Sequence, residues 1–405
     1  MEEALKANQP SRNPSYLENV HPMSLDLRVC FYLFVATIPA ETYPFIKSFS
    51  ISQILGVVFI FIIGIRGKWI LKTPSKPFWF FSIYYTIVLL SVQWLNPSYF
   101  PYWQKRVGQF GQLLFFFWIC TILVSYRELA KGAIAAYSYS LVTVITLAKL
   151  HVPGFVSEQA LDVYHERATI GDADPNGFAV KSGVALIYFL DKFLDQYERK
   201  SKWNWFFFLL MGYLSFVIIE TQSRGGQLAV LIGLVVYVFT RSFTINRRKM
   251  LTIMVLVVLA FTIYAYKDPQ MARRWKQTIE EGDLSARERI FPEAVNMIKR
   301  KPVFGYGLCD HLWILGAATA RDQRDPHNSF FWVLHELGFV GGTWYIIAFI
   351  MCGVMAYKKR KGALGNIPLV YFVIILAASL SLTAVYFKVT WFVLSLAAAE
   401  DQKHH

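Results

Sequence analysis

A histidine stands where a long apolar stretch of the sequence begins. His327 lies in the segment DPHNSFFWVLHELGFVGG, which starts at Asp325 and reads as the opening of a transmembrane helix. Asn328 or Ser329 can cap that helix, so His327 is not needed there for structural reasons. An imidazole is well suited to take up a proton near neutral pH. The position therefore favours a general base, and an interfacial polar residue is the alternative interpretation.

Several arginines are expected on the same side of the membrane as this histidine. Arg224 opens an apolar stretch and Arg167 precedes another, while Arg287 and Arg289 lie in a long loop. A guanidinium can bind a pyrophosphate through two parallel hydrogen bonds, and the positive end of a helix near Arg224 adds to the attraction. Any one of them is more simply a solvated charge or a lipid-headgroup contact. An arginine that opens a membrane span is costly without a partner, however, so the set predicts an anion site.

Other polar residues near His327 are weaker candidates. Arg321 and Arg324 could bind an acceptor phosphate, although a plain loop role is the simpler interpretation. His335 and Glu336 lie inside the expected span, where ionisable groups mark a pathway or a buried pair. The residues alone leave open whether one of these two, rather than His327, is the base.

The triplet Asp172, Ala173, Asp174 has the DxD form that holds a divalent metal in nucleotide-sugar glycosyltransferases. Here it continues through Pro175 and Asn176 into a helix, which is typical of turn and cap chemistry. Arginines can neutralise a diphosphate without a metal. The sequence also contains no P-loop, dinucleotide-binding fingerprint, HExxH or nucleophile elbow. We therefore expect no metal and no cofactor, and no nucleotide-driven transporter.

These residues are positioned by apolar runs long enough to cross the roughly 30 Å hydrocarbon core of a membrane. Twelve runs lie near 24–44, 49–65, 77–95, 108–125, 130–150, 176–194, 203–220, 224–240, 249–266, 329–357, 367–382 and 384–399. The last two could instead form one broken hairpin. The sequence predicts an all-α polytopic membrane protein with about 12 transmembrane helices and a large, partly helical loop between helices 9 and 10.

The composition supports a membrane location and gives an orientation. The chain has 405 residues, of which 55% are hydrophobic and 17% charged, too apolar for an ordinary soluble domain. Its net charge of +14 is concentrated near 66–76, 192–202, 241–249 and 358–361, all on one side of the twelve-helix arrangement. The positive-inside rule places both termini in the cytoplasm, so we expect no nucleic-acid partner. The first 22 residues show no cleavable signal peptide.

The largest loop should carry the chemistry, because ordering a long loop costs entropy that a function must offset. Ser285 and Glu288 form a capping box for a helix that runs toward Lys301, with Pro292 either kinking it or marking its first turn. Gly338 and Gly342, four residues apart, predict the close approach of another helix. The expected organisation is a cytoplasmic tail (1–23), nine helices (24–266), the loop with the catalytic segment (267–328), three helices (329–399) and a tail (400–405).

One pattern connects the histidine segment with a known family. His327, Asn328, nine residues, Gly338, two residues and Gly341 match the form H-[NSQ]-x9-G-x-x-[GTY], which is the signature of bacterial O-antigen ligases. Three further segments resemble the same O-antigen ligase and polymerase superfamily: SRGG at 223–226, the stretch 285–294 followed by KPVFGYG, and ERATIGDADPNGFA at 166–179. The first two and the histidine segment span about 220–345, and the third is more similar to ligases than to other members.

The resemblance implies a reaction and roles for the residues. It implies an inverting transfer of O-antigen glycan from undecaprenyl pyrophosphate to a sugar hydroxyl of lipid A-core, at the periplasmic face of the bacterial inner membrane. His327 would be the base, and Arg224 and Arg287 would bind the pyrophosphate. In the family's pattern an arginine stands four residues before an aromatic, which fits Arg287 and Phe291, although many relatives have tryptophan at the latter position. The further substrate-binding candidates are Arg167, Arg289, Asn328, Arg321 and Arg324. A monomer in contact with membrane lipids is expected.

Three other functions remain compatible with the residues. An O-antigen polymerase would use a second lipid-linked repeat unit as acceptor. Protein O-oligosaccharyltransferases share the superfamily but are usually longer. A transporter or flippase for lipid-linked glycans would predict paired halves with broken helices at corresponding positions, and the sequence shows no such internal symmetry.

Overall fold

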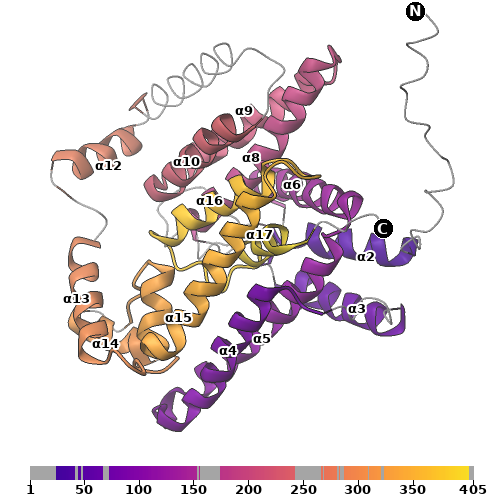
Figure 1. Ribbon diagram of the computed structural model, residues 1–405. Coiled ribbons are helices and arrows are strands. Elements are labelled where there is room, and N and C mark those ends of the chain that lie inside the picture. The colour runs from indigo at the N-terminus through magenta and orange to yellow at the C-terminus, as the bar shows by residue number, and fades with distance from the viewer. Residues whose placement is uncertain are drawn as a thin grey trace, which may run out of the picture.

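The computed structural model describes residues 24–41, 44–46, 49–66, 73–152, 155, 174–241, 266–267, 269–280, 282, 287–308, 310–320 and 323–400. Helices dominate this part of the chain (Figure 1). They are α2 (Leu25–Ala36), α3 (Ile51–Arg66), α4 (Lys76–Leu90), α5 (Phe100–Leu123), α6 (Arg127–Lys149), α8 (Pro175–Glu198), α9 (Asn204–Glu220), α10 (Arg224–Thr240), α12 (Pro269–Glu280), α13 (Arg287–Arg300), α14 (Asp310–Ala318), α15 (Ser329–Lys358), α16 (Ile367–Ser379) and α17 (Lys388–Ala398).

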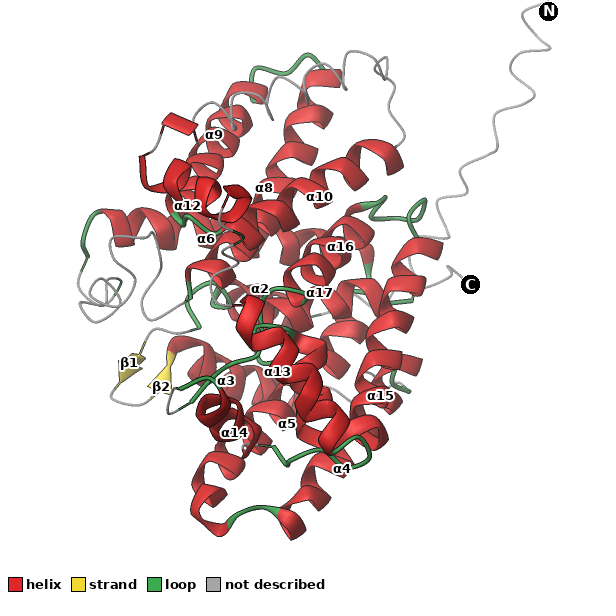
Figure 2. Cartoon of the chain, turned by 90° about the vertical axis from the view of Figure 1, so that its left-hand side faces the viewer, coloured by secondary structure: helices red, strands yellow, loops and turns green. Residues whose placement is uncertain are grey.

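Short irregular elements complete the described fold. Two 3-10 helices, η2 (Ser91–Trp94) and η3 (Pro97–Tyr99), connect α4 to α5. Strands β1 (Pro44–Ile46) and β2 (Phe49–Ser50) pair antiparallel between α2 and α3 and form a small hairpin at the edge of the helical body (Figure 2). The sequence did not predict this hairpin, because strands of three and two residues leave no periodic signal.

The predicted helical class is confirmed, whereas the number of membrane spans stays a prediction. Eleven of the twelve apolar runs fall on helices, and the run 249–266 lies almost wholly outside the described residues. Three helical stretches in the described part are long and apolar enough to cross a membrane, namely Pro97–Leu123, Arg127–Lys149 and Ser329–Lys358. Five shorter apolar helices accompany them, including α9, α10 and α17. The tails 1–23 and 401–405 are also outside the described residues.

The helix α17 occupies the middle of the bundle. Every residue from Val389 to Ala398 is buried, and α17 packs against α5, α15 and α16. Its Trp391 contacts Phe81 and Phe110, with ring centroids 4.9 and 5.2 Å apart. Large apolar side chains on other helices face outward, as Phe61 and Leu209 do at 68% and 67% exposure. Such apolar outer surfaces suit a hydrocarbon environment.

The large loop forms three helices, α12, α13 and α14, which stand on one side of the molecule in Figure 1. α13 runs from Arg287 to Arg300, as the sequence predicted, and Pro292 lies inside it rather than in its first turn. Ser285 of the expected capping box is outside the described residues. α13 and α14 both pack on α15. Within α14, the ring of Trp313 stacks on Tyr99 with ring centroids 4.0 Å apart, which connects this loop to the start of α5.

The close approach of another helix, which was predicted for Gly338 and Gly342, is not seen in the described part of the chain: the atoms nearest to a Cβ on either glycine belong to the turn at 302–303 or to α15 itself. Instead α15 is broken at Gly338, where φ is 57° and ψ is −158°. The backbone of the KPVFGYG turn docks into the break, since Phe339 N donates to the Pro302 carbonyl at 2.7 Å. A Cβ on Gly338 would lie 2.3 Å from the Val303 carbonyl oxygen, so only glycine fits. Gly342 instead faces the preceding turn of its own helix.

The KPVFGYG turn also forms hydrogen bonds with the residues of α15 that precede the break at Gly338. Tyr306 N donates to the His335 carbonyl and Gly307 N to the Glu336 carbonyl, both at 2.8 Å. These bonds satisfy carbonyls that an unbroken helix would have used internally, which is required wherever backbone is buried from water. The large loop and the histidine-bearing half of α15 therefore form one hydrogen-bonded unit.

Candidate functional site

The connection between α16 and α17, residues 380–387, joins the elements that carry the candidate residues. Arg287, the first residue of α13, donates from Nη2 to the Ser381 carbonyl at 2.8 Å. A Cβ on Gly225 would lie 2.6 Å from Ser381 Oγ, so the start of α10 comes equally close to this connection. The two elements that begin with Arg224 and Arg287 thus meet at one residue.

The histidine segment is fixed to the same connection. Of the two residues that the sequence offered as caps, Asn328 caps α15 by accepting from the backbone N–H groups of Phe330 and Phe331. Its Nδ2 donates to the Leu380 carbonyl at 3.2 Å. Ser329 Oγ donates to the Leu382 carbonyl at 3.0 Å and accepts from the backbone N–H of Ala384 at 2.9 Å. Because both cap residues are bonded, the position of His327 just before them is set by the connection.

His327 is held in an uncommon backbone conformation beside a carboxylate. Its φ is 49°, in the left-handed region, and its backbone N–H donates to Asp325 Oδ1 at 2.6 Å. The same oxygen accepts from Thr383 Oγ1 at 2.5 Å and lies 3.9 Å from His327 Nδ1. The imidazole is 33% exposed, so it can meet a substrate. Asp325 is thus oriented from the α16–α17 connection and lies close to the imidazole it could support.

A cap fixes the start of α10. Ser223 Oγ accepts from Gly226 N at 3.0 Å and donates to Asn176 Oδ1 at 2.6 Å. Asp174 in turn caps α8 by accepting from Asn176 N at 2.9 Å. The carboxylate of Asp174 thus serves as cap chemistry, as the sequence predicted, and the starts of α8 and α10 lie together.

Arg224 itself reaches α12. Its Nη1 donates to the carbonyl of Arg274 at 2.7 Å and to Thr278 Oγ1. In the reverse direction, Arg274 Nη1 donates to the carbonyl of Gln222 at 2.9 Å. α12 is therefore bonded across the start of α10, with the guanidinium of Arg224 between them.

The charged groups near the starts of α10 and α13 interact electrostatically. Burial lowers the pKa of Arg287, and the nearby charge of Arg224 lowers it further, while Asp174 and Asp325 act in the opposite direction. A guanidinium remains protonated even so. Two like charges brought within electrostatic range repel each other, and a bound anion would relieve that repulsion.

The remaining predicted residues differ in their placement. Arg289 is exposed on α13, and Arg324 is tied by its backbone N–H to the Leu312 carbonyl of α14 at 3.0 Å. Neither has a described contact with the residues at the connection. Arg167 and Arg321 lie outside the described residues.

The two alternative bases are buried deep inside the bundle. Glu336 is fully buried and accepts hydrogen bonds from Tyr84, Trp332 and Tyr386. His335 is also fully buried, with Nε2 2.9 Å from the Ala294 carbonyl. Side chains without exposed surface cannot meet a sugar hydroxyl without rearrangement, so this geometry favours His327.

Sequence reasoning missed the residues that join the site together. Asp325 could have been noted, because it stands two residues before His327. Ser381 lies near the end of the predicted run 367–382 and Thr383 between the last two runs, where nothing in the local sequence marks them. Their partners are 58 and 94 residues away in the sequence, a separation that leaves no periodic pattern.

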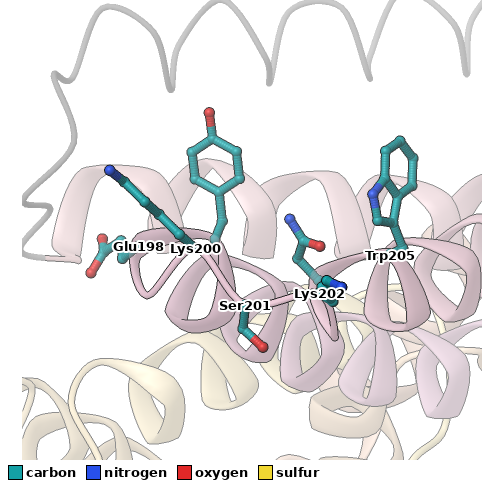
Figure 3. A pocket seen from close by; sticks show the side chains of 7 residues that line it. Glu198, Lys200, Ser201, Lys202 and Trp205 are labelled. Carbon is teal, nitrogen blue, oxygen red and sulfur yellow. The ribbon is translucent and has the colours of Figure 1, made fainter.

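A surface hollow at the turn between α8 and α9 lies elsewhere. Glu198, Lys200, Ser201, Lys202 and Trp205 line it, together with Tyr197 and Asn204 (Figure 3). It is at the opposite end of α8 from Asn176, and a helix of 24 residues separates these ends by about 35 Å. The hollow therefore takes no part in the arrangement around His327.

The fold and this arrangement together define a helical integral membrane protein with a histidine and two arginines gathered at one end. The model of the O-antigen ligase family matches residues 206–346, about a third of the chain. That range contains Arg224, Arg287 and His327, so the resemblance to the O-antigen ligase family is confirmed for residues 206–346, while the similar segment 166–179 lies outside the match. No curated protein matched the chain in a sequence comparison.

Proposed function

We propose that the protein is an O-antigen ligase. It would transfer O-antigen glycan from undecaprenyl pyrophosphate to a sugar hydroxyl of lipid A-core, at the periplasmic face of the bacterial inner membrane. The observation that supports this most is the convergence on the connection 380–387: Arg287 and Gly225 contact Ser381, and Thr383 holds the carboxylate beside His327. The family match supports a ligase or polymerase type of reaction.

The chemistry follows from these groups. The acceptor hydroxyl attacks the anomeric carbon of the donor, His327 takes the hydroxyl proton, and the bond from that carbon to the pyrophosphate oxygen breaks. Attack opposite the leaving group inverts the anomeric centre. Asp325 stabilises the imidazolium that forms, and Arg224 and Arg287 stabilise the departing undecaprenyl pyrophosphate. Arginine forks suffice for this charge, so we expect transfer to proceed without a divalent metal.

The test is transfer by the purified protein in lipid, with undecaprenyl-pyrophosphate glycan and rough lipopolysaccharide in the presence of EDTA. His327→Ala should lower the rate by about 10²–10⁴, the usual contribution of a general base. His151→Ala is a matched control, because His151 also has a positive φ of 53° but lies at the exposed end of α6. Equal activity of the wild type and a folded His327→Ala variant would overturn the role of this residue.

The polymerase alternative gives a different result in the same system. If the glycan elongates on the donor when lipopolysaccharide is omitted, the protein is a polymerase rather than a ligase. If a folded protein that binds donor transfers nothing under either condition, the transferase proposal fails.

A further inference from the structure

A second group of charged residues, buried or half-buried, lies beside the arrangement around His327. Lys181 of α8 is 3% exposed, and its Nζ lies 2.7 Å from Glu41 Oε1. Lys388, the first residue of α17, donates from Nζ to Ser52 Oγ at 2.6 Å and from its backbone N–H to Glu41 Oε2 at 3.2 Å. Four parts of the chain thus contribute to one polar cluster: the segment after α2, the N-terminal part of α8, and the starts of α3 and α17.

The charges of this cluster do not balance. Two lysines share the single carboxylate of Glu41, and the ammonium of Lys388 is bonded to a hydroxyl rather than to an acid among the described residues. A buried charge that lacks a counter-charge is costly, and in a membrane protein such groups mark substrate or ion sites. The cluster of Lys181, Lys388 and Glu41 therefore has one positive charge in excess, which a bound anion would neutralise.

The cluster lies at the same end of the bundle as the candidate arginines. Lys388 directly follows the connection 380–387, whose Ser381 accepts from Arg287. Lys181 is one helical turn beyond Gly177, where an added Cβ would lie 2.8 Å from the Phe387 ring. Asn176, which precedes that glycine, is bonded to the cap of α10. The connection therefore has arginines at one end and lysines at the other.

We propose that Lys388 and Lys181 form a second anion subsite, which binds a phosphate group. Lysine binds phosphate as a compact point charge, and Ser52 supplies a hydroxyl at the same place. The phosphate could belong to the donor's diphosphate or to a phosphorylated sugar of the acceptor. Only the identity of these two sources rests on the proposed function; binding of an anion by the lysines does not.

The experiment measures binding, not transfer. The full chain is placed in phosphatidylcholine nanodiscs, and its affinity is measured for inorganic pyrophosphate and for rough lipopolysaccharide with a phosphorylated or a dephosphorylated core. Lys388→Met should weaken binding of pyrophosphate, or abolish the preference for the phosphorylated core, by about tenfold or more. Lys388→Arg should keep the affinity within about threefold. Lys149→Met is the control, because Lys149 already pairs with Glu220 at 2.6 Å.

A second variant makes the test independent of the folding of the first. Glu41→Gln removes the only carboxylate that the described residues contribute to the cluster, so it should tighten phosphate binding if the lysines form a subsite. If both variants leave the affinities for both probes unchanged, the cluster is only a structural ion pair and the proposal is overturned. If Lys388→Met does not fold, unchanged affinities of Glu41→Gln for both probes are enough to overturn the proposal. If the two variants change phosphate binding as expected but the wild-type protein transfers no glycan, the phosphate subsite stands and the proposed ligase function fails.

Discussion

Asparagine in place of Asp325 tests whether the carboxylate supports His327 as a base. The substitution keeps the size of the side chain and one oxygen that can accept from Thr383 Oγ1 and from the backbone N–H of His327, now at 2.5 and 2.6 Å. It removes the negative charge and replaces the second carboxylate oxygen by an NH2 group. If His327 takes up a proton in the reaction, that charge stabilises the transition state more than the ground state.

The expected magnitude follows from the distance of 3.9 Å between Asp325 Oδ1 and His327 Nδ1. Two unit charges at this separation attract by about 1 kcal/mol in water and by about 4 kcal/mol at an effective dielectric constant of 20. Both side chains are about a third exposed, at 33% and 38%, so solvent screens part of the attraction. We expect about 1–2 kcal/mol, which corresponds to a fall in kcat of roughly 5- to 30-fold.

The assay is steady-state glycan transfer at varied donor concentration, with kcat and KM determined separately. For Asp325→Asn, kcat should fall while KM for the donor changes little. Thr383→Val should give a smaller loss of roughly 2- to 12-fold because it removes one hydrogen bond to the carboxylate, and Thr383→Ser should restore the rate. Asp195→Asn is the control, since Asp195 is also 38% exposed but pairs with Arg241 at 2.6 Å.

Two results would refute this reasoning. A kcat for Asp325→Asn within about twofold of the wild type would show that the charge does not act on the reaction. A rise in KM for the donor that matches the fall in kcat/KM would show that Asp325 contributes to binding instead.

Three further predictions concern the surroundings of the site. Gly338→Ala should lower the free energy of unfolding by at least about 2 kcal/mol, because Gly338 has a positive φ and an added Cβ would overlap the Val303 carbonyl. Gly212→Ala, on an open helix face, should leave the free energy of unfolding unchanged, and thermal unfolding of the two variants tests this. Thr278→Val should tighten donor binding by about 2- to 10-fold, since the Arg224 guanidinium loses one competing hydrogen bond, and weaker binding in a titration would contradict this. Glu336→Gln should retain most transfer activity, because its contacts lie inside the bundle, whereas a loss comparable to that of His327→Ala would reinstate Glu336 as a base.

Local patterns predicted the helices and their caps well. The N-cap role of Asn328, the start of α10 at Arg224 and the helix ending before KPVFGYG each depend on a few neighbouring residues, and each is found as expected. These features are determined within one or two helical turns, which is the range over which sequence periodicity carries information.

Contacts between distant segments could not be predicted in the same way. The break at Gly338 looked like a helix-packing glycine, because the turn that fills it lies more than 30 residues earlier in the chain. The bond from Thr383 to Asp325 and the approach of Gly225 to Ser381 depend on how whole helices pack. Packing of this kind is set by side-chain shape across the bundle and leaves no spacing rule in the sequence.

The irregular backbone at this end explains why its residues depend on one another. In a membrane protein, backbone that leaves a helix must be satisfied by other protein groups. Here the turn at 302–307 bonds the break in α15, and the connection 380–387 bonds the cap of α15 and the first residue of α13. Each irregular segment therefore completes the hydrogen bonding of another. A change in the connection should thus displace His327 and Arg287 together, although neither residue belongs to it.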